Sequence, residues 1–212
     1  MRATVEATVR HGYRNLVGTL TVSLLVSLTV VPLLAMATVG TPLAVLAGLW
    51  ATCLALGVVL IGAFRFATTV ARRGVPIAVV PELRAGLTAP RTGLALGAST
   101  FVVLAVGVAL VGLTPTSFQS IAVGVAAFLL ADWYLVVGFA APELGAGRPL
   151  RTALRAGVDR LLDAPDAVAV FLVLSFVCAL VAGVTIVTVG LFLPGVLCLL
   201  AAHVTDAIDA DR

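Results

Sequence analysis

Charged side chains are scarce in this chain of 212 residues, and lysine is missing altogether. Only 11% of the residues are charged, whereas soluble domains carry about a quarter. The mean hydropathy is +1.20. This composition excludes an ordinary soluble domain and predicts an integral membrane protein. The formal net charge of +3 is small and the arginines are not interleaved with aromatic residues, so the sequence also argues against binding of nucleic acid.

Cysteine and histidine, which build disulfide frameworks and many metal sites, are rare too. Cys53, Cys178 and Cys198 all fall in apolar runs and lack the spacing of metal ligands. His203 precedes Asp206 by one helical turn, but His11 is the only other histidine, so a metal site would lack ligands. The sequence has no nucleophile elbow, no phosphate-cradling glycine loop and no paired-histidine zinc motif. We therefore expect no metal, no cofactor and no enzymatic activity.

Long apolar runs make up most of the chain. They repeatedly reach the roughly 20 residues that a helix needs to cross a hydrocarbon core of about 30 Å. The sequence predicts an all-α, polytopic transmembrane helical bundle that forms one domain over residues 1–212. About six spans are expected, at residues 16–39, 42–64, 92–113, 118–141, 166–184 and 187–204. The last apolar run is too long for one span and is divided within Gly183–Gly190. Because each half is short, a re-entrant hairpin stays open as an alternative.

The arginines indicate how the spans are oriented. All 13 fall in the N-terminal tail, in segments 65–91 and 148–160, or at Arg212. In a six-span chain these segments lie on one side, which the positive-inside rule makes cytoplasmic. We expect a multi-pass protein of the cell (inner) membrane with both termini in the cytoplasm. A cleaved signal peptide ending near Ala35–Ala37 is the alternative, which the length of the apolar run and Pro32 disfavour.

Two segments between spans have the pattern of amphipathic helices, and we interpret them as cytoplasmic elbow helices. The better defined one is Pro149–Pro165, where apolar residues recur at helical spacing and a proline stands at each end. The other is Pro81–Arg91. On the first helix Arg151, Arg155 and Arg160 form a candidate interaction surface, either for lipid phosphates or for a cytoplasmic protein partner.

One acidic residue, Asp132, lies inside a predicted span. Insertion scales put the cost of such an acid at the bilayer centre at roughly 2.5–3.5 kcal/mol, so it usually faces a polar cavity. We take Asp132 and Tyr134 as a candidate intramembrane polar site. Trp133 and Tyr134 support a second interpretation, because such aromatic residues favour the membrane boundary, where an acid costs little. The sequence leaves both interpretations open.

Several of these elements also occur together in a known family. A proline and a Thr-hydrophobic-Gly turn lead into the second span; an aromatic residue, a proline, an amphipathic helix and a final proline follow later. The residues concerned are Pro32, Thr38–Gly40, Tyr134, Pro142, Pro149 and Pro165. In these features the chain resembles the YesL-like family of small polytopic membrane proteins, a domain of unknown function. The resemblance implies an accessory role near carbohydrate uptake and supplies no catalytic residues.

These features favour a non-catalytic accessory or scaffold component, associated with the uptake of carbohydrate or another solute. Its expected partners are the lipid bilayer and either a membrane transporter or a cytoplasmic protein. The alternative is a small transporter or channel in which Asp132 responds to protons or cations. An enzyme that acts on lipids is a more distant hypothesis, because the polar residues do not converge. The sequence does not indicate an oligomeric state.

Overall fold

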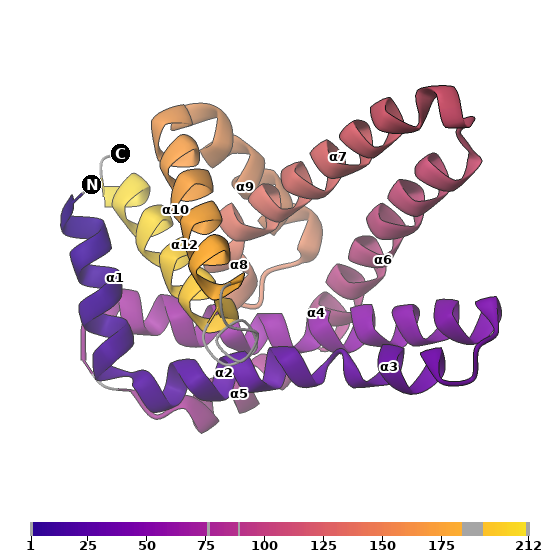
Figure 1. Cartoon of the computed structure of the whole chain (residues 1–212). Coiled ribbons are helices and arrows are strands. Elements are labelled where there is room, and N and C mark those ends of the chain that lie inside the picture. Colours follow the sequence, from indigo (N-terminus) through magenta and orange to yellow (C-terminus); the bar gives the residue numbers. More distant parts are fainter. Residues whose placement is uncertain (1, 76, 89, 184–192, 211–212) are drawn as a thin grey trace.

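The computed structural model of the chain describes residues 2–75, 77–88, 90–183 and 193–210. Within these residues the protein is helical and has no strand, which confirms the predicted all-α class (Figure 1). The elements are α1 (Arg2–Arg14), α2 (Leu16–Leu28), α3 (Val31–Ala37), α4 (Pro42–Arg73), α5 (Val79–Leu87), α6 (Pro90–Leu113), the 3-10 turn η1 (Thr116–Phe118), α7 (Gln119–Phe139), α8 (Ala141–Gly145), α9 (Leu150–Asp163), α10 (Pro165–Gly183) and α12 (Leu193–Ala210).

Five segments of the described chain are long and apolar enough to cross a membrane. There are six if α9 and α10, which meet at a bend of 102°, are counted together as one span. The five are α2 with α3, α4, α6, η1 with α7, and α12. The third and fourth of these, α6 and η1 with α7, differ by no more than two residues at either end from the predicted spans 92–113 and 118–141. The prediction of a polytopic helical membrane protein is thereby confirmed.

The first span is broken rather than continuous, because Pro32 has no N–H to donate to the Leu28 carbonyl. The break falls at Thr29 and Val30, between α2 and α3. Beyond it, the Leu33 N–H donates to the Thr52 hydroxyl of α4 over 3.2 Å. The neighbouring span thus satisfies a backbone donor that the break sets free, and α3 packs along α4.

Helix α4 extends nine residues past the predicted end of the second span at residue 64. It begins at an N-cap, where the Thr41 hydroxyl accepts the Ala44 N–H over 3.2 Å and Pro42 occupies the first turn. It ends at Gly74, whose φ of 63° is the left-handed conformation that glycine adopts readily. No proline stands between these two signals, so the helix continues beyond its most apolar stretch.

The last two helices are separate, as predicted, but their bounds differ from the prediction. Helix α10 ends at Gly183, and the rest of the predicted Gly183–Gly190 break lies outside the described residues. Helix α12 begins six residues after the predicted span 187–204 and ends six residues after it. Its last turns are polar and pack against neighbouring helices. The helix therefore continues past the apolar stretch from which the span was predicted.

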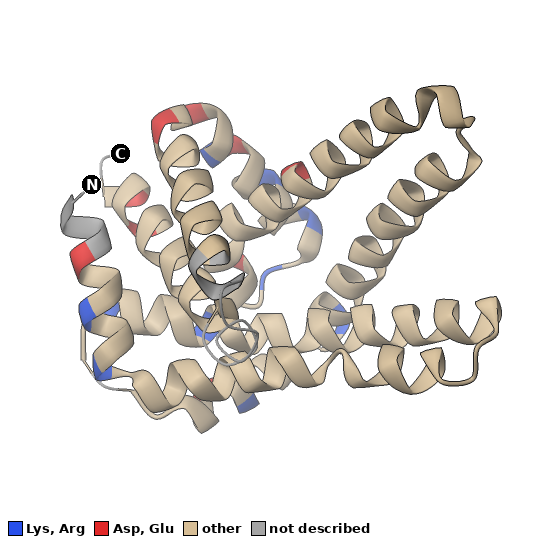
Figure 2. Cartoon of the chain, in the orientation of Figure 1, with Lys and Arg blue, Asp and Glu red and all other residues tan. Residues whose placement is uncertain are grey.

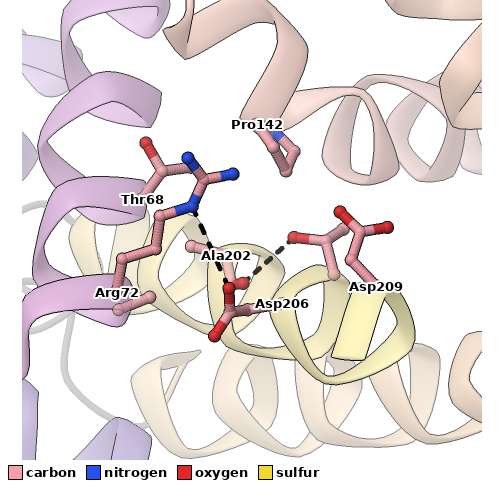
Figure 3. A pocket seen from close by; sticks show the side chains of 8 residues that line it. Thr68, Arg72, Pro142, Ala202, Asp206 and Asp209 are labelled. Carbon is pink, nitrogen blue, oxygen red and sulfur yellow. Dashed lines mark hydrogen bonds and ion pairs between the residues drawn. The ribbon is translucent and has the colours of Figure 1, made fainter. Parts of the chain in front are cut away.

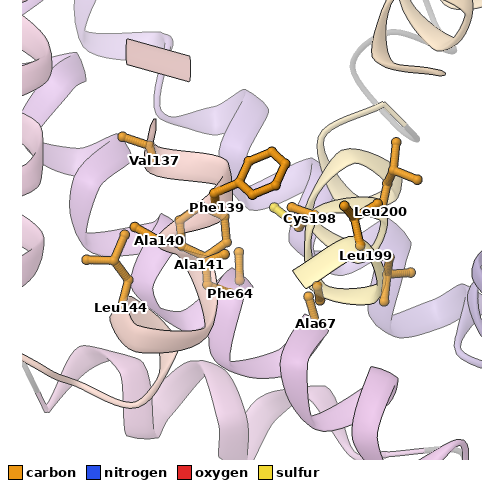
Figure 4. Close-up of a cluster of buried hydrophobic side chains, with 14 of the residues drawn as sticks. Phe64, Ala67, Val137, Phe139, Ala140, Ala141, Leu144, Cys198, Leu199 and Leu200 are labelled. Carbon is orange, nitrogen blue, oxygen red and sulfur yellow. The ribbon is translucent and has the colours of Figure 1, made fainter. Parts of the chain in front are cut away.

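The hydrophobic core lies where α4, α7, α8 and α12 meet (Figure 4). Fully buried side chains from these helices include Phe64, Ala67, Phe139, Leu144 and Leu199. Away from this core the helices separate: α6 and α7 form a hairpin that diverges from α3 and α4 toward its tip (Figure 1). The core therefore fixes one end of the bundle, the end near which both termini lie.

Charged residues gather at this same end of the molecule. Figure 2 shows them on α1, α9, α12 and the segments that join the helices, while the tips of the α3–α4 and α6–α7 hairpins carry none. Both predicted elbow helices are present, although Pro81–Arg91 is divided between α5 and the start of α6. Helix α5 packs closely on α4, and its Glu82 pairs with Arg65 at 3.0 Å.

Candidate functional site

The two members of the candidate intramembrane site, Asp132 and Tyr134, point away from each other. Two residues are 200° apart around a helix, so neighbours of this spacing lie on opposite faces. The Asp132 side chain is exposed, whereas Tyr134 is partly buried against α10. Its hydroxyl lies 3.1 Å from the Ser175 hydroxyl, and its ring stacks on Phe171 with a centroid distance of 5.6 Å. The structure therefore does not bring the two residues into one site.

Tyr134 instead lines an apolar cavity of about 220 Å³ among α4, α7, α10 and α12. The other lining residues are Leu56, Leu60, Phe64, Val137, Gly138, Phe171, Pro194, Leu197, Cys198 and Ala201. Asp132 is not among them. Its neighbour Trp133 donates its indole N–H to the Thr100 hydroxyl of α6 over 3.1 Å, a contact that holds the α6–α7 hairpin together.

The most elaborate polar arrangement in the described residues surrounds Arg160 of α9. Its guanidinium binds the Asp209 carboxylate of α12 with two hydrogen bonds, of 3.0 and 2.8 Å. It also donates to the Glu143 carboxylate of α8 at 3.3 Å and to the Phe139 carbonyl at the end of α7 at 3.2 Å. We call Arg160, Asp209, Glu143 and the Phe139 carbonyl the arginine clasp, because they fasten four helices at one point.

The guanidinium at the centre of the arginine clasp is buried, and its charge is balanced by its neighbours. Arg160 is only 6% exposed, and Arg148 completes the balance by pairing with the second oxygen of Glu143 at 2.9 Å. Burial by itself lowers the pKa of Arg160, but the hydrogen bonds and charges of Asp209 and then Glu143 outweigh it and raise that pKa. The guanidinium is therefore charged under all physiological conditions, and its carboxylate partners hold it in place.

The burial of Arg160 in the clasp shows that, contrary to the prediction, it does not belong to an exposed interaction surface. Arg160 lies on the same stripe of α9 as Ala153 and Gly157, both of which are buried against α7. A Cβ atom on Gly157 would lie 2.6 Å from the Val136 carbonyl, so the two helices touch at their backbones. Because this stripe faces the bundle, Arg160 cannot reach a partner.

Arg151 and Arg155 lie on the opposite side of α9 and are exposed, as predicted for an interaction surface. Two large apolar residues share this side with them: Val158 is 40% exposed and Leu162 is 75% exposed. We call these four residues the outer face of α9. The clasp and the buried stripe thus hold an amphipathic helix on the bundle with its outer face uncovered.

A shallow hollow of about 10 Å³, roughly the space of one water molecule, adjoins the clasp between α4, α8 and α12 (Figure 3). Asp209 contributes to its wall, as do Pro142 and Thr68. Arg72 of α4 pairs there with Asp206 of α12 at 4.0 Å, and both side chains are largely exposed. This outer ion pair is too solvated to stabilise the fold strongly.

A second polar junction fastens α1 to the bundle. The Nδ1 atom of His203 lies 2.9 Å from the Leu199 carbonyl, which can only accept, so Nδ1 carries the proton. The Nε2 atom of His203 lies 2.9 Å from the Nδ1 atom of His11, so the two rings share a hydrogen bond. Asn15 accepts the Ile77 N–H over 2.8 Å, which ties the end of α1 to the segment after α4.

This junction predicts that acid loosens α1. Burial first, and then the positive charges of His203, Arg14 and Arg10, lower the pKa of His11 below 6.5. The undocked helix therefore binds more protons than the docked one between the lowered pKa and 6.5. The stability that the junction contributes is present above about pH 6.5 and falls as the pH drops below it.

Thermal unfolding of the wild type and of His11→Gln across this pH range measures the effect. We expect the stability advantage of the wild type to shrink as the solution is acidified, because glutamine does not titrate. A difference that stays constant with pH would contradict this account of the junction.

No family model matches the chain, and no similar curated protein or solved structure is found.

Proposed function

We propose that the protein is a non-catalytic accessory or scaffold component of the cell membrane and that it binds a protein partner through the outer face of α9. The observation that carries the proposal is the mounting of this helix. Its inner stripe and the arginine clasp fix its position, while Arg151, Arg155 and Leu162 remain exposed. A surface that is already ordered loses little conformational entropy when it binds.

The chemistry of the outer face suits a protein better than lipid headgroups. Asp159 and Asp163 are also exposed, about 40° and 80° around the helix from Arg155, so the exposed side of α9 carries both signs of charge. Anionic lipids attract purely basic segments, whereas protein interfaces pair charges of both signs around an apolar centre. Leu162 is the most exposed large apolar side chain of this helix and supplies such a centre.

We also propose that the end of the molecule that carries the charges and both termini faces the cytoplasm. The arginine distribution supports this orientation through the positive-inside rule. The resemblance to YesL-like proteins suggests that the partner takes part in solute uptake. No contact of Asp132 among the described residues favours the alternative of a small transporter or channel.

Affinity purification in mild detergent tests the proposal. We expect a stable partner to copurify with the wild type and to be lost from Arg151→Glu/Arg155→Glu. The matched control is Arg84→Glu/Arg91→Glu, which reverses two exposed arginines elsewhere and should retain the partner. Recovery of no partner, together with solute transport by the purified protein in liposomes, would overturn the proposal.

A further inference from the structure

One exposed acid, Asp132, lies inside the span that η1 and α7 form. It follows Phe118, at the uncharged tip of the α6–α7 hairpin, by 14 residues and precedes the end of α7 by seven (Figure 2). At 1.5 Å per residue, these separations are about 21 and 10 Å along the helix. The neighbouring Trp133 contacts Thr100, which follows Arg91 on α6 by nine residues, or about 14 Å. In a hydrocarbon core of about 30 Å, the acid therefore lies about a third of the way in from the charged end of the molecule.

The Asp132 side chain has no partner among the residues that the structure describes. It forms no hydrogen bond or ion pair with them and is exposed on α7. Residues 92–147 contain no arginine, lysine or histidine, so neither α7 nor α6 beyond Arg91 offers it a cation. An acid at this depth is costly to leave facing lipid, and intramembrane acids almost always pair with another polar group. The described part of the chain does not supply that group.

Asp132 is the last member of an exposed stripe on α7 whose other members are apolar. These are Ile121, Val125 and Phe128, which are 63%, 45% and 68% exposed. We call the three residues and Asp132 the acid stripe. Their spacing of four, three and four residues is that of the seam along which one helix packs on another in a coiled coil. At 100° per residue, the members lie about 100–160° around α7 from Ala126, which lies against Gly107 of α6, so α6 does not cover the stripe.

Lipid chains satisfy the apolar residues of the acid stripe but not its carboxylate. The group that suits Asp132 is a cation, because opposite charges attract more strongly in a medium of low dielectric constant than in water. A second copy of this chain, related by a two-fold axis, would present the same stripe to itself. Two carboxylates at one site disfavour each other's charge, so a second copy does not suit the acid. The acid stripe therefore fits a helix of a different membrane protein.

We propose that the acid stripe binds a transmembrane helix of another membrane protein, which carries an arginine or a lysine at the depth of Asp132. The ion pair sets the register between the two helices, while Ile121, Val125 and Phe128 pack along the partner helix. The outer face of α9 lies on a different helix, so this interface is independent of the proposed function and is tested at different residues.

Site-specific photo-crosslinking in intact cells tests the acid stripe, with the probe at Phe128, one helical turn from Asp132. We expect an adduct with a membrane protein. Mass spectrometry should map the crosslink to a transmembrane helix that contains an arginine or a lysine. The matched control is a probe at Phe176 of α10, which is 65% exposed and has no acid within one turn of its helix. This control should capture lipid and not that helix.

Changing the acid shows whether its charge holds the partner. Asp132→Leu should lower the yield of the Phe128 adduct about tenfold, whereas Asp132→Glu should retain most of it. Because Asp132 has no partner within the described chain, Asp132→Leu should leave thermal stability in detergent unchanged, so a lost adduct does not reflect a lost fold.

A charge exchange completes the test. Asp132→Lys should abolish the adduct, and an acid in place of the partner's arginine or lysine should restore it. An adduct with a second copy of this chain or with lipid alone, an adduct undiminished by Asp132→Leu, or a crosslinked helix without a basic residue would overturn the proposal. Capture of the same helix from Phe176 would overturn it as well.

Discussion

Arg160→Met should destabilise the protein by about 2–3 kcal/mol, less than the roughly 3–5 kcal/mol for breaking a fully buried ion pair, because Asp209 is partly solvated and Glu143 keeps Arg148 as a partner. The substitution keeps the apolar stem of the side chain but leaves Asp209 and Glu143 without their common cation. It also orphans the Phe139 carbonyl, to which Arg160 donates over 3.2 Å. Unfolding by heat or by denaturing detergent, followed by size-exclusion chromatography, measures the loss.

Two further variants distinguish the stability lost with the clasp from a general effect of removing an arginine. Arg155→Met removes an exposed arginine from the same helix and should change stability by no more than about 0.5 kcal/mol. Arg160→Lys retains the charge but cannot form two parallel hydrogen bonds with Asp209, so its loss should be intermediate. Equal stability of Arg160→Met and Arg155→Met would show that the clasp does not stabilise the fold.

Gly97→Ala should be strongly destabilising for a single added methyl group. Helices α4 and α6 cross at Gly57, Gly93 and Gly97, with their backbones in contact. A Cβ atom on Gly97 would overlap the Cys53 carbonyl oxygen, and a backbone atom cannot rotate away as a side chain can. Close approach through small residues is a main source of packing between membrane helices. We expect a loss of about 3 kcal/mol, the upper end of the range for overpacking.

Gly112→Ala provides the matched control within the same helix. No atom lies within 4 Å of a Cβ built at Gly112, so the added methyl group meets open space. Its effect on stability should be small, and unfolding in mixed detergent micelles compares the two variants directly. A loss at Gly112 as large as that at Gly97 would show that the close crossing of α4 and α6 is not its cause.

Helix positions could be predicted from the sequence where a local signal marks both ends. Pro42 begins α4, as expected, because proline fits a first turn. Pro165, which was expected to stop the elbow helix, follows the end of α9 and also begins α10. Helix α4 continues nine residues past the predicted end of the second span, because a helix need not stop where its most apolar stretch ends. The actual end, Gly74, carries the ordinary glycine signal for a helix terminus.

The clasp could not be predicted because its members are far apart in the chain. Asp209 lies 49 residues from Arg160, and Glu143 lies 17 residues from it. One signal was nevertheless present: Arg160 follows Ala153 and Gly157 at helical spacing, so a charged residue stands on the apolar stripe of its helix. Such a residue points to a buried partner and not to an interaction surface.

The surroundings of Asp132 could not be predicted from its sequence context, which left both a polar cavity and a membrane boundary open. Its position within an apolar run suggested a polar cavity, but its side chain is exposed on α7 and the neighbouring cavity is lined by Tyr134. The face on which a residue lies depends on how the helices pack, and an almost uniformly apolar helix gives no pattern from which to infer that packing.

We propose that the outer face of α9 contacts a protein in the membrane-bound state. Site-specific photo-crosslinking in intact cells measures this most directly, with the probe at Leu162 and, as a control, at Leu113, which is 85% exposed at the tip of the α6–α7 hairpin. We predict a discrete protein adduct from Leu162 that disappears in the Arg151→Glu/Arg155→Glu background and does not form from Leu113. Adducts from Leu162 to lipid alone, or a protein adduct unaffected by reversing the two arginines, would contradict the claim.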